Sequence, residues 1–219
     1  MKSRKHILIT VFAVLLEFCV MYGIILFQRN FVIVFPLAVR SISVMILQWV
    51  LLIVPVSFMK ISKESLFDYG FTNDKIGMQI VTGILVGAAF CVIFTLLPIL
   101  LGFKEMVGQT SYTEVWQFCY EFIYMIFGVA LVEEFFYRGF LFKRLQDISD
   151  SKWFPMIVSS IVFGFSHIFN GSMIQVVTTS ILGIVFCVCR YKIKNCSTLS
   201  LIIAHGMHNA LIVFLVSIL

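Results

Sequence analysis

Residues 115–142, VWQFCYEFIYMIFGVALVEEFFYRGFLF, form an apolar run that decides how this sequence folds. Near its end stand two adjacent carboxylates, Glu133 and Glu134, and one guanidinium, Arg138. A charged side chain at membrane depth costs about 2.5 kcal/mol or more unless it is paired or hydrated, so such residues usually mark functional sites. The run therefore predicts a membrane-spanning helix that carries a functional group of charges.

The composition of the whole chain requires lipid as the solvent. Of the 219 residues, 61% are hydrophobic and 12% are charged, and that charged fraction is about half of what a soluble domain carries. The net charge is +5, but no basic stripe alternates with exposed aromatics, so nucleic acid is not an expected partner. These properties predict an all-α, polytopic membrane helix bundle in which the bilayer is the main partner.

Seven apolar segments approach the length of about 20 residues that a membrane-spanning helix needs. Gly83 and Gly87 form a small-x-x-x-small face that favours close helix packing. We expect one integral-membrane domain over residues 1–219, with a motif-bearing core at 115–219. The predicted spans are Ile7–Phe27, a tilted or broken segment centred on Ile42–Met59, Met78–Leu101, Val115–Phe142, Trp153–Phe169, Met173–Cys189 and Ser197–Leu219.

The positive charges predict the orientation of the bundle. With seven spans, twelve of the 16 basic residues fall on the side of the N-terminus. Arg29 and Lys104 fall on the other side, and Arg40 and Arg138 fall within spans. The positive-inside rule then places the N-terminus in the cytoplasm. The short loops between the spans favour location of the protein in a bacterial cell membrane.

Polar residues on three late spans fall at similar depths. By a rise of 1.5 Å per residue, Glu133 lies about 15 Å from the cytoplasmic end of its span and His167 about 20 Å from the end of the next. On the last span, His205 and Asn209 lie about 12 and 18 Å deep by the same rise. Their spacing of four residues places these two on one helix face. The agreement predicts one shared polar cavity.

These residue types support a narrow range of chemistry. A carboxylate and an imidazole in a cavity of low dielectric constant can hold and deprotonate a water molecule, and a His/Asn pair can donate hydrogen bonds to an oxyanion. Zinc ligation by Glu133, His167 and His205 is the alternative, although no H-E-x-x-H motif is present. No Ser or Cys is marked as a nucleophile, because Ser166 beside His167 is expected to point to a different helix face.

Three motifs in register resemble those of a known family. They are Glu133-Glu134-x-x-x-Arg138, Phe163-x-x-x-His167 and His205-x-x-x-Asn209, and they resemble the motifs of the CPBP family. That family contains the CAAX-prenyl-protease and bacteriocin-processing intramembrane endopeptidases, also called Abi proteins. The resemblance implies that Glu133 activates water with His167 as its partner. It further implies that His205 and Asn209 form the oxyanion site, and that Glu134 and Arg138 support it. It leaves open whether a zinc ion takes part.

We therefore predict an intramembrane endopeptidase that cleaves a membrane-associated peptide or protein. One alternative is a non-catalytic membrane immunity or scaffold protein. Another is a proton-coupled transporter, which the lack of internal repeats disfavours. Among the other intramembrane polar residues, His208 is expected to be structural. Glu17, Arg40 and Glu121 are expected to pair or to snorkel.

Overall fold

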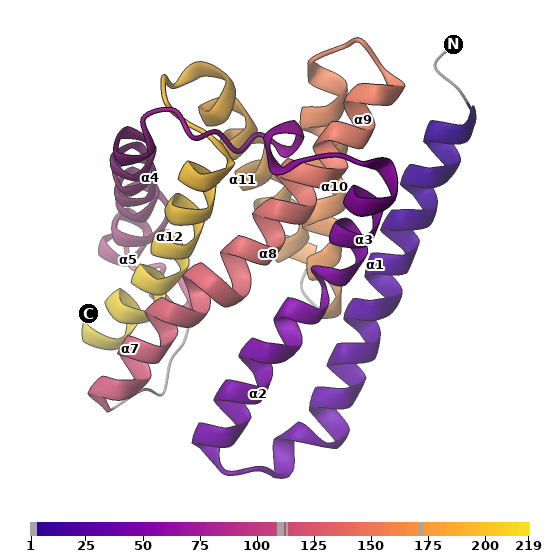
Figure 1. Cartoon of the computed structure of the whole chain (residues 1–219). Coiled ribbons are helices and arrows are strands. Elements are labelled where there is room, and N and C mark those ends of the chain that lie inside the picture. The colour runs from indigo at the N-terminus through magenta and orange to yellow at the C-terminus, as the bar shows by residue number, and fades with distance from the viewer. Residues whose placement is uncertain (1–3, 109–111, 113, 171–172) are drawn as a thin grey trace. The chain divides into compact units, whose positions relative to one another are not determined.

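Helices make up all the regular structure of the computed structural model over residues 4–108, 112, 114–170 and 173–219, which are the residues described (Figure 1). Six helical segments are long and apolar enough to cross a membrane, and the helical stretch Trp153–Phe169 is apolar but shorter. The predicted all-α, polytopic bundle is therefore confirmed. The six segments are Arg4–Val34, Leu37–Ser62, Ile76–Leu100, Val115–Ile148, Met173–Lys192 and Thr198–Ile218.

Several apolar segments consist of more than one helical element. The α-helices are α1 (Arg4–Asn30), α2 (Leu37–Val50), α3 (Ile53–Ser62), α4 (Ile76–Cys91), α5 (Leu97–Leu100), α6 (Lys104–Val107), α7 (Val115–Ile123), α8 (Leu131–Glu134), α9 (Phe142–Ile148), α10 (Trp153–Ser166), α11 (Met173–Lys192) and α12 (Thr198–Ile218). Three stretches are π-helical: η3 (Val92–Leu96), η4 (Tyr124–Ala130) and η5 (Phe135–Leu141). The 3₁₀ turns are η1 (Val32–Val34), η2 (Leu66–Tyr69) and η6 (His167–Asn170).

The second and fourth spans show how far the predicted ranges match the observed helices. The second is broken, as expected, because a turn at Leu51 and Leu52 separates α2 from α3. The fourth continues as far as Ile148, beyond its predicted end at Phe142. An ion pair between Lys143 and Asp147, with an N–O distance of 2.6 Å, stabilises this added turn across four residues.

The described residues group into two compact units. The first contains Met1–Thr72 and Val132–Lys192, and the second contains Asn73–Leu131 and Ile193–Leu219. The first unit carries the Glu-Glu-Arg motif and the histidine of the second motif. The second unit carries the third motif on α12. That the chain forms one domain stays a prediction.

In the second unit, α4 and α12 pack closely through glycine. A Cβ atom on Gly83 would lie 2.7 Å from the backbone oxygen of Ser200, and one on Gly87 would lie 2.9 Å from that of Ala204. No larger residue fits these positions unless the helices separate. The small-x-x-x-small prediction for this face is therefore confirmed.

In the first unit, the segment between α3 and α4 packs against η5. The Tyr69 ring meets the rings of Phe135 and Phe140 edge to face, with centroids 5.7 and 6.0 Å away. A Cβ atom on Gly139 would lie 3.2 Å from the Tyr69 side chain. Glycine at this position therefore lets η2 approach the helix that carries the acidic motif.

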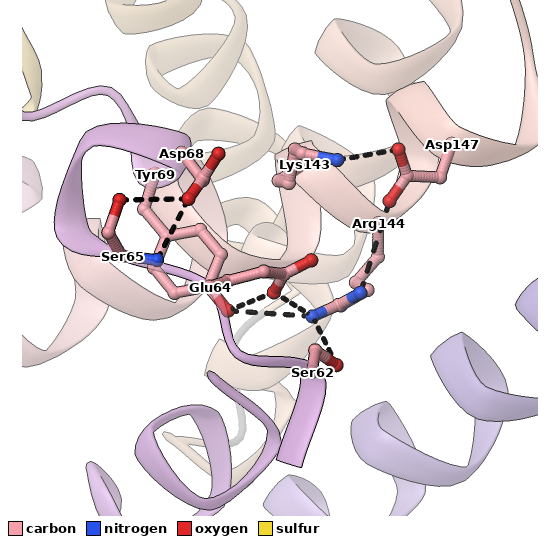
Figure 2. Close-up of polar contacts among 8 residues, drawn as sticks. All are labelled: Ser62, Glu64, Ser65, Asp68, Tyr69, Lys143, Arg144 and Asp147. Carbon is pink, nitrogen blue, oxygen red and sulfur yellow. Dashed lines mark hydrogen bonds and ion pairs between the residues drawn. The ribbon is translucent and has the colours of Figure 1, made fainter. Parts of the chain in front are cut away.

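Polar contacts hold this segment in place (Figure 2). The Tyr69 hydroxyl donates a hydrogen bond of 2.7 Å to Glu64, and Arg144 of α9 forms an ion pair with the same carboxylate. Burial and the Glu64 carboxylate raise the pKa of Tyr69, so its hydroxyl stays protonated as a donor. Hydrogen bonds from Ser65 lower the pKa of Asp68 and complete a capping box. The segment is thereby tied to the helix that extends the acidic motif.

Substitution of Gly83 tests the close packing in the second unit. We expect Gly83→Ala to lower the free energy of unfolding by about 1–3 kcal/mol, because the new methyl group overlaps a backbone oxygen. Gly77→Ala on the same helix is the matched control, since a Cβ atom there has nothing within 4 Å. The control should be neutral or stabilise by up to about 1 kcal/mol. Thermal unfolding in detergent measures both, and equal effects would contradict the close packing.

Candidate functional site

Two π-helical stretches flank the acidic residues of the first motif. The element α8 lies between η4 and η5 in the sequence, and it contains Glu133 and Glu134. A π-helical turn widens the helix and changes the direction of the side chains that follow, and such turns often occur at functional sites. The guanidinium of Arg190 on α11 donates a hydrogen bond of 2.6 Å to the backbone carbonyl of Arg138, inside η5. A second helix therefore supports the widened turn.

Glu134 and Arg138 form a fully buried ion pair, as their spacing predicts. Their N–O distance is 3.0 Å, and both side chains are 0% exposed. The Arg138 guanidinium lies 4.0 Å from the centre of the Phe163 ring and 5.7 Å from that of Phe186. A Cβ atom on Gly183 would come within 3.0 Å of the same guanidinium. The pair therefore joins η5 to α10 and α11 through charge, ring stacking and a glycine.

Glu133 and His167 line one cavity of about 250 Å³ within the first unit. A buried water needs roughly 10–15 Å³ of such space, so the cavity has room for several. The structure therefore brings the predicted carboxylate and imidazole to the same cavity. The lining residues are Glu17, Met21, Ile24, Ile25, Gln28, Gln48, Leu51, Val132, Glu133, Phe136, Tyr137, Ser166, His167 and Phe169.

Hydrogen bonding determines which nitrogen of His167 carries the proton. Its Nδ1 atom lies 3.1 Å from the backbone carbonyl oxygen of Phe163. A carbonyl can only accept, so this hydrogen bond requires a proton on Nδ1. In the neutral ring, Nε2 then has a free lone pair that can accept a proton or bind a metal. The edge-to-face contact with the Phe163 ring, with centroids 5.1 Å apart, further orients the imidazole.

The structure places Ser166 on the cavity, so the prediction that it faces elsewhere is wrong. The helix α10 ends at Ser166 and the chain continues as the 3₁₀ turn η6, so α-helical spacing no longer applies. The Ser166 hydroxyl nevertheless donates a 2.6 Å hydrogen bond to the Phe163 carbonyl. It faces the protonated Nδ1 of His167 at 3.3 Å. No base therefore takes its proton, which argues against a serine nucleophile.

Glu17 is a cavity residue that the sequence analysis did not assign to the site. It was expected to pair or snorkel, but its side chain is only 4% exposed and lines the cavity with Glu133. Its Oε2 atom is buried and has no hydrogen-bond partner among the described residues. Glu121, in the other unit, accepts a 3.0 Å hydrogen bond from Tyr112. The spacing of Glu17 from Gln28, along one face of α1, was the available signal.

In the second unit, His205 and Asn209 lie four residues apart on α12. His205 is 6% exposed, and Asn209 is partly buried. His208 points elsewhere, because its Nε2 lies 3.3 Å from the Thr95 hydroxyl and its ring meets the edge of Phe90. These contacts support a structural role for His208. That His205 and Asn209 meet Glu133 and His167 at one site stays a prediction.

The cavity carries three possible zinc ligands, Glu17, Glu133 and His167. In the part of the chain that the structure describes, no three His, Cys, Asp or Glu side chains are grouped to hold a metal. Catalytic zinc sites use three protein ligands, and these three line the cavity without being grouped around one point. Zinc therefore stays a prediction that requires His205 as the third ligand.

These features define a class: a polytopic membrane protein with a polar cavity between its helices. Residues 115–211 match the family model for type II CAAX prenyl endopeptidases, described as Rce1-like. The predicted resemblance to the CAAX protease family is thereby confirmed for this part of the chain, and the match supports intramembrane protease function in general. No curated protein and no solved structure matches the chain. The matched segment contains all six predicted site residues, Glu133, Glu134, Arg138, His167, His205 and Asn209.

Removing one partner of the buried pair tests its contribution to folding. We expect Arg138→Ala to lower the free energy of unfolding by about 3–5 kcal/mol, because Glu134 then loses its counter-ion in an apolar interior. Asp147→Ala breaks the more exposed pairs with Lys143 and Arg144 and should cost less than about 1 kcal/mol. The double variant Glu134→Leu, Arg138→Met should recover most of the loss. Similar losses for Arg138→Ala and Asp147→Ala in thermal unfolding would contradict this account.

Proposed function

We propose that this protein is an intramembrane endopeptidase that uses a water molecule activated by Glu133 and His167. The observation that carries the proposal is the shared cavity of the first unit, which a carboxylate and an imidazole with a free Nε2 both line. The match of residues 115–211 to a CAAX endopeptidase family supports the same reaction class. The substrate is a peptide or protein held at the membrane.

The reaction begins with a water molecule bound by Glu133 in the cavity. The carboxylate accepts one proton while the oxygen attacks the carbonyl carbon of the peptide bond, and a tetrahedral intermediate forms. The acquired proton then passes to the leaving nitrogen as the carbon–nitrogen bond breaks. The products are a carboxylic acid and an amine, which together contain the atoms of substrate and water. No acyl-enzyme forms.

The other motif residues have supporting roles in this proposal. The lone pair on Nε2 of His167 accepts a hydrogen bond from the attacking water and orients it. His205 and Asn209 donate hydrogen bonds to the oxyanion of the intermediate. The buried pair of Glu134 and Arg138 holds η5 and so positions the neighbouring Glu133. A cytoplasmic N-terminus in a bacterial cell membrane is the setting we propose from the pattern of basic residues.

Substitution of the two cavity groups tests the proposed chemistry. We expect Glu133→Gln and His167→Ala each to lower the cleavage rate by about 10²–10⁴-fold, since each removes a group that holds or deprotonates water. Ser166→Ala is the matched control from the same cavity and should stay within a factor of about three of the unaltered protein. Mass spectrometry of single-span peptide reporters in proteoliposomes measures the rates.

Each variant also requires a thermal unfolding curve, so that loss of folding is distinguished from loss of chemistry. Full cleavage by both Glu133→Gln and His167→Ala, with intact folding, would overturn the proposal. A loss in Ser166→Ala equal to that of the two variants would instead point to a serine nucleophile.

Metal analysis tests the alternative that zinc activates the water. Because no three ligands are grouped to hold a metal among the described residues, we expect less than one equivalent of zinc in the purified protein, and cleavage that survives dialysis against EDTA. One equivalent of zinc that disappears in both His167→Ala and His205→Ala would show that His205 completes a zinc site. Elemental analysis provides this answer independently of activity.

A further inference from the structure

We propose that Glu17 forms a subsite that binds a positively charged side chain, lysine or arginine, of the peptide substrate. This inference rests on the proposed endopeptidase function and adds a specificity determinant to the same cavity. It concerns α1, which lies outside the segment that matches the protease family.

Burial of the Glu17 carboxyl group costs free energy unless a ligand pairs with it. Glu17 lies 13 residues beyond Arg4, about 20 Å along α1 by the rise of an α-helix, and therefore deep in a span. Its side chain is 96% buried, and its Oε2 atom has no hydrogen-bond partner among the described residues. A buried polar atom without a partner costs free energy, which a bound cationic group would offset. The atom belongs to a residue that lines the cavity, where a ligand has access to it.

The acidic lining of the cavity favours a cation. Two carboxylates line it, Glu17 and Glu133, and no lysine or arginine does so among the described residues. Two carboxylates in one cavity repel each other, and a cation between them relieves that repulsion. In this proposal the substrate supplies the complementary cationic group.

The walls of the cavity suit the long side chain of lysine or arginine. Met21 and Ile24 follow Glu17 along one face of α1, and Leu51, directly after α2, lines the same cavity. Such apolar walls fit the methylene groups of a long basic side chain while its charged end reaches the carboxylate. The amide of Gln28 offers a further acceptor one turn after Ile24. A small cation has no apolar part that could pack against these walls.

The test compares single-span peptide reporters that differ at one position. Lysine, methionine or glutamate is placed in turn at each of the four positions before and after the scissile bond. At one position we expect kcat/KM for the lysine reporter to exceed that for the methionine reporter by about 30-fold or more, as for a desolvated charge pair. Glu17→Gln should abolish this preference, mainly through KM, and Glu17→Lys should transfer it to the glutamate reporter.

Glu121→Gln is the matched control, because Glu121 is a buried carboxylate of α7 that belongs to the other unit and is hydrogen-bonded by Tyr112. It should retain the preference for lysine. Two results would overturn the inference. One is an unchanged preference in Glu17→Gln, and the other is an equal loss of cleavage for all reporters with KM unaltered, which would make Glu17 a structural or proton-carrying group.

A binding measurement separates failure of this inference from failure of the proposed function. In the His167→Ala background, which is expected to be inactive but keeps both carboxylates of the cavity, the lysine reporter should bind about 30-fold more tightly than the methionine reporter by fluorescence anisotropy. Adding Glu17→Gln should remove the difference. If no reporter is cleaved by the unaltered protein but this difference is seen, the subsite stands and the peptidase proposal fails. Equal binding of the two reporters would overturn the subsite.

Discussion

The buried ion pair between Glu134 and Arg138 is the constraint on which the first unit depends. Both side chains are inaccessible, and the guanidinium stacks against Phe163 of α10. Separating such charges in an apolar interior leaves one of them uncompensated, so neither residue can move without the other. The pair fixes η5 against two other helices. Glu133 and His167 flank this arrangement in sequence, the first beside Glu134 and the second four residues after Phe163.

The same principle explains why the polar residues of this protein have different roles. Glu134 has a counter-ion, Glu121 has a hydroxyl donor, and the Oε2 atom of Glu17 has neither among the described residues. A carboxylate that is satisfied within the protein contributes to folding, whereas one that is left on a cavity can interact with a ligand. This distinction also brings α1 into the site, although α1 carries none of the three motifs.

Much of the fold followed from elementary patterns in the sequence. Apolar runs long enough to cross the bilayer are expected to be helical, because lipid offers no hydrogen-bond partner to backbone N–H and C=O groups. This rule predicted the helices. The spacing of Glu134 and Arg138 predicted their pair, and the spacing of Gly83 and Gly87 predicted close packing. Local periodicity was enough to predict these contacts. Glu134 and Arg138 lie on one helix, and glycine lacks a side chain, so its spacing directly indicates a close approach. The three motifs likewise located the part of the chain that matches a protease family.

Tertiary structure decided what helical periodicity could not. The end of α10 at Ser166 turned that side chain toward the cavity, and the Phe163 carbonyl determined the proton position on His167. Glu17 entered the site because α1 contributes one face to the same cavity, and no local pattern reports which face of a helix its neighbours will cover. By itself, the sequence determined which side chains cost free energy when they are buried in lipid, since that free energy depends on residue type and depth. Which of those buried polar groups find a partner within the protein depends on contacts between distant segments, so only the tertiary structure decided it.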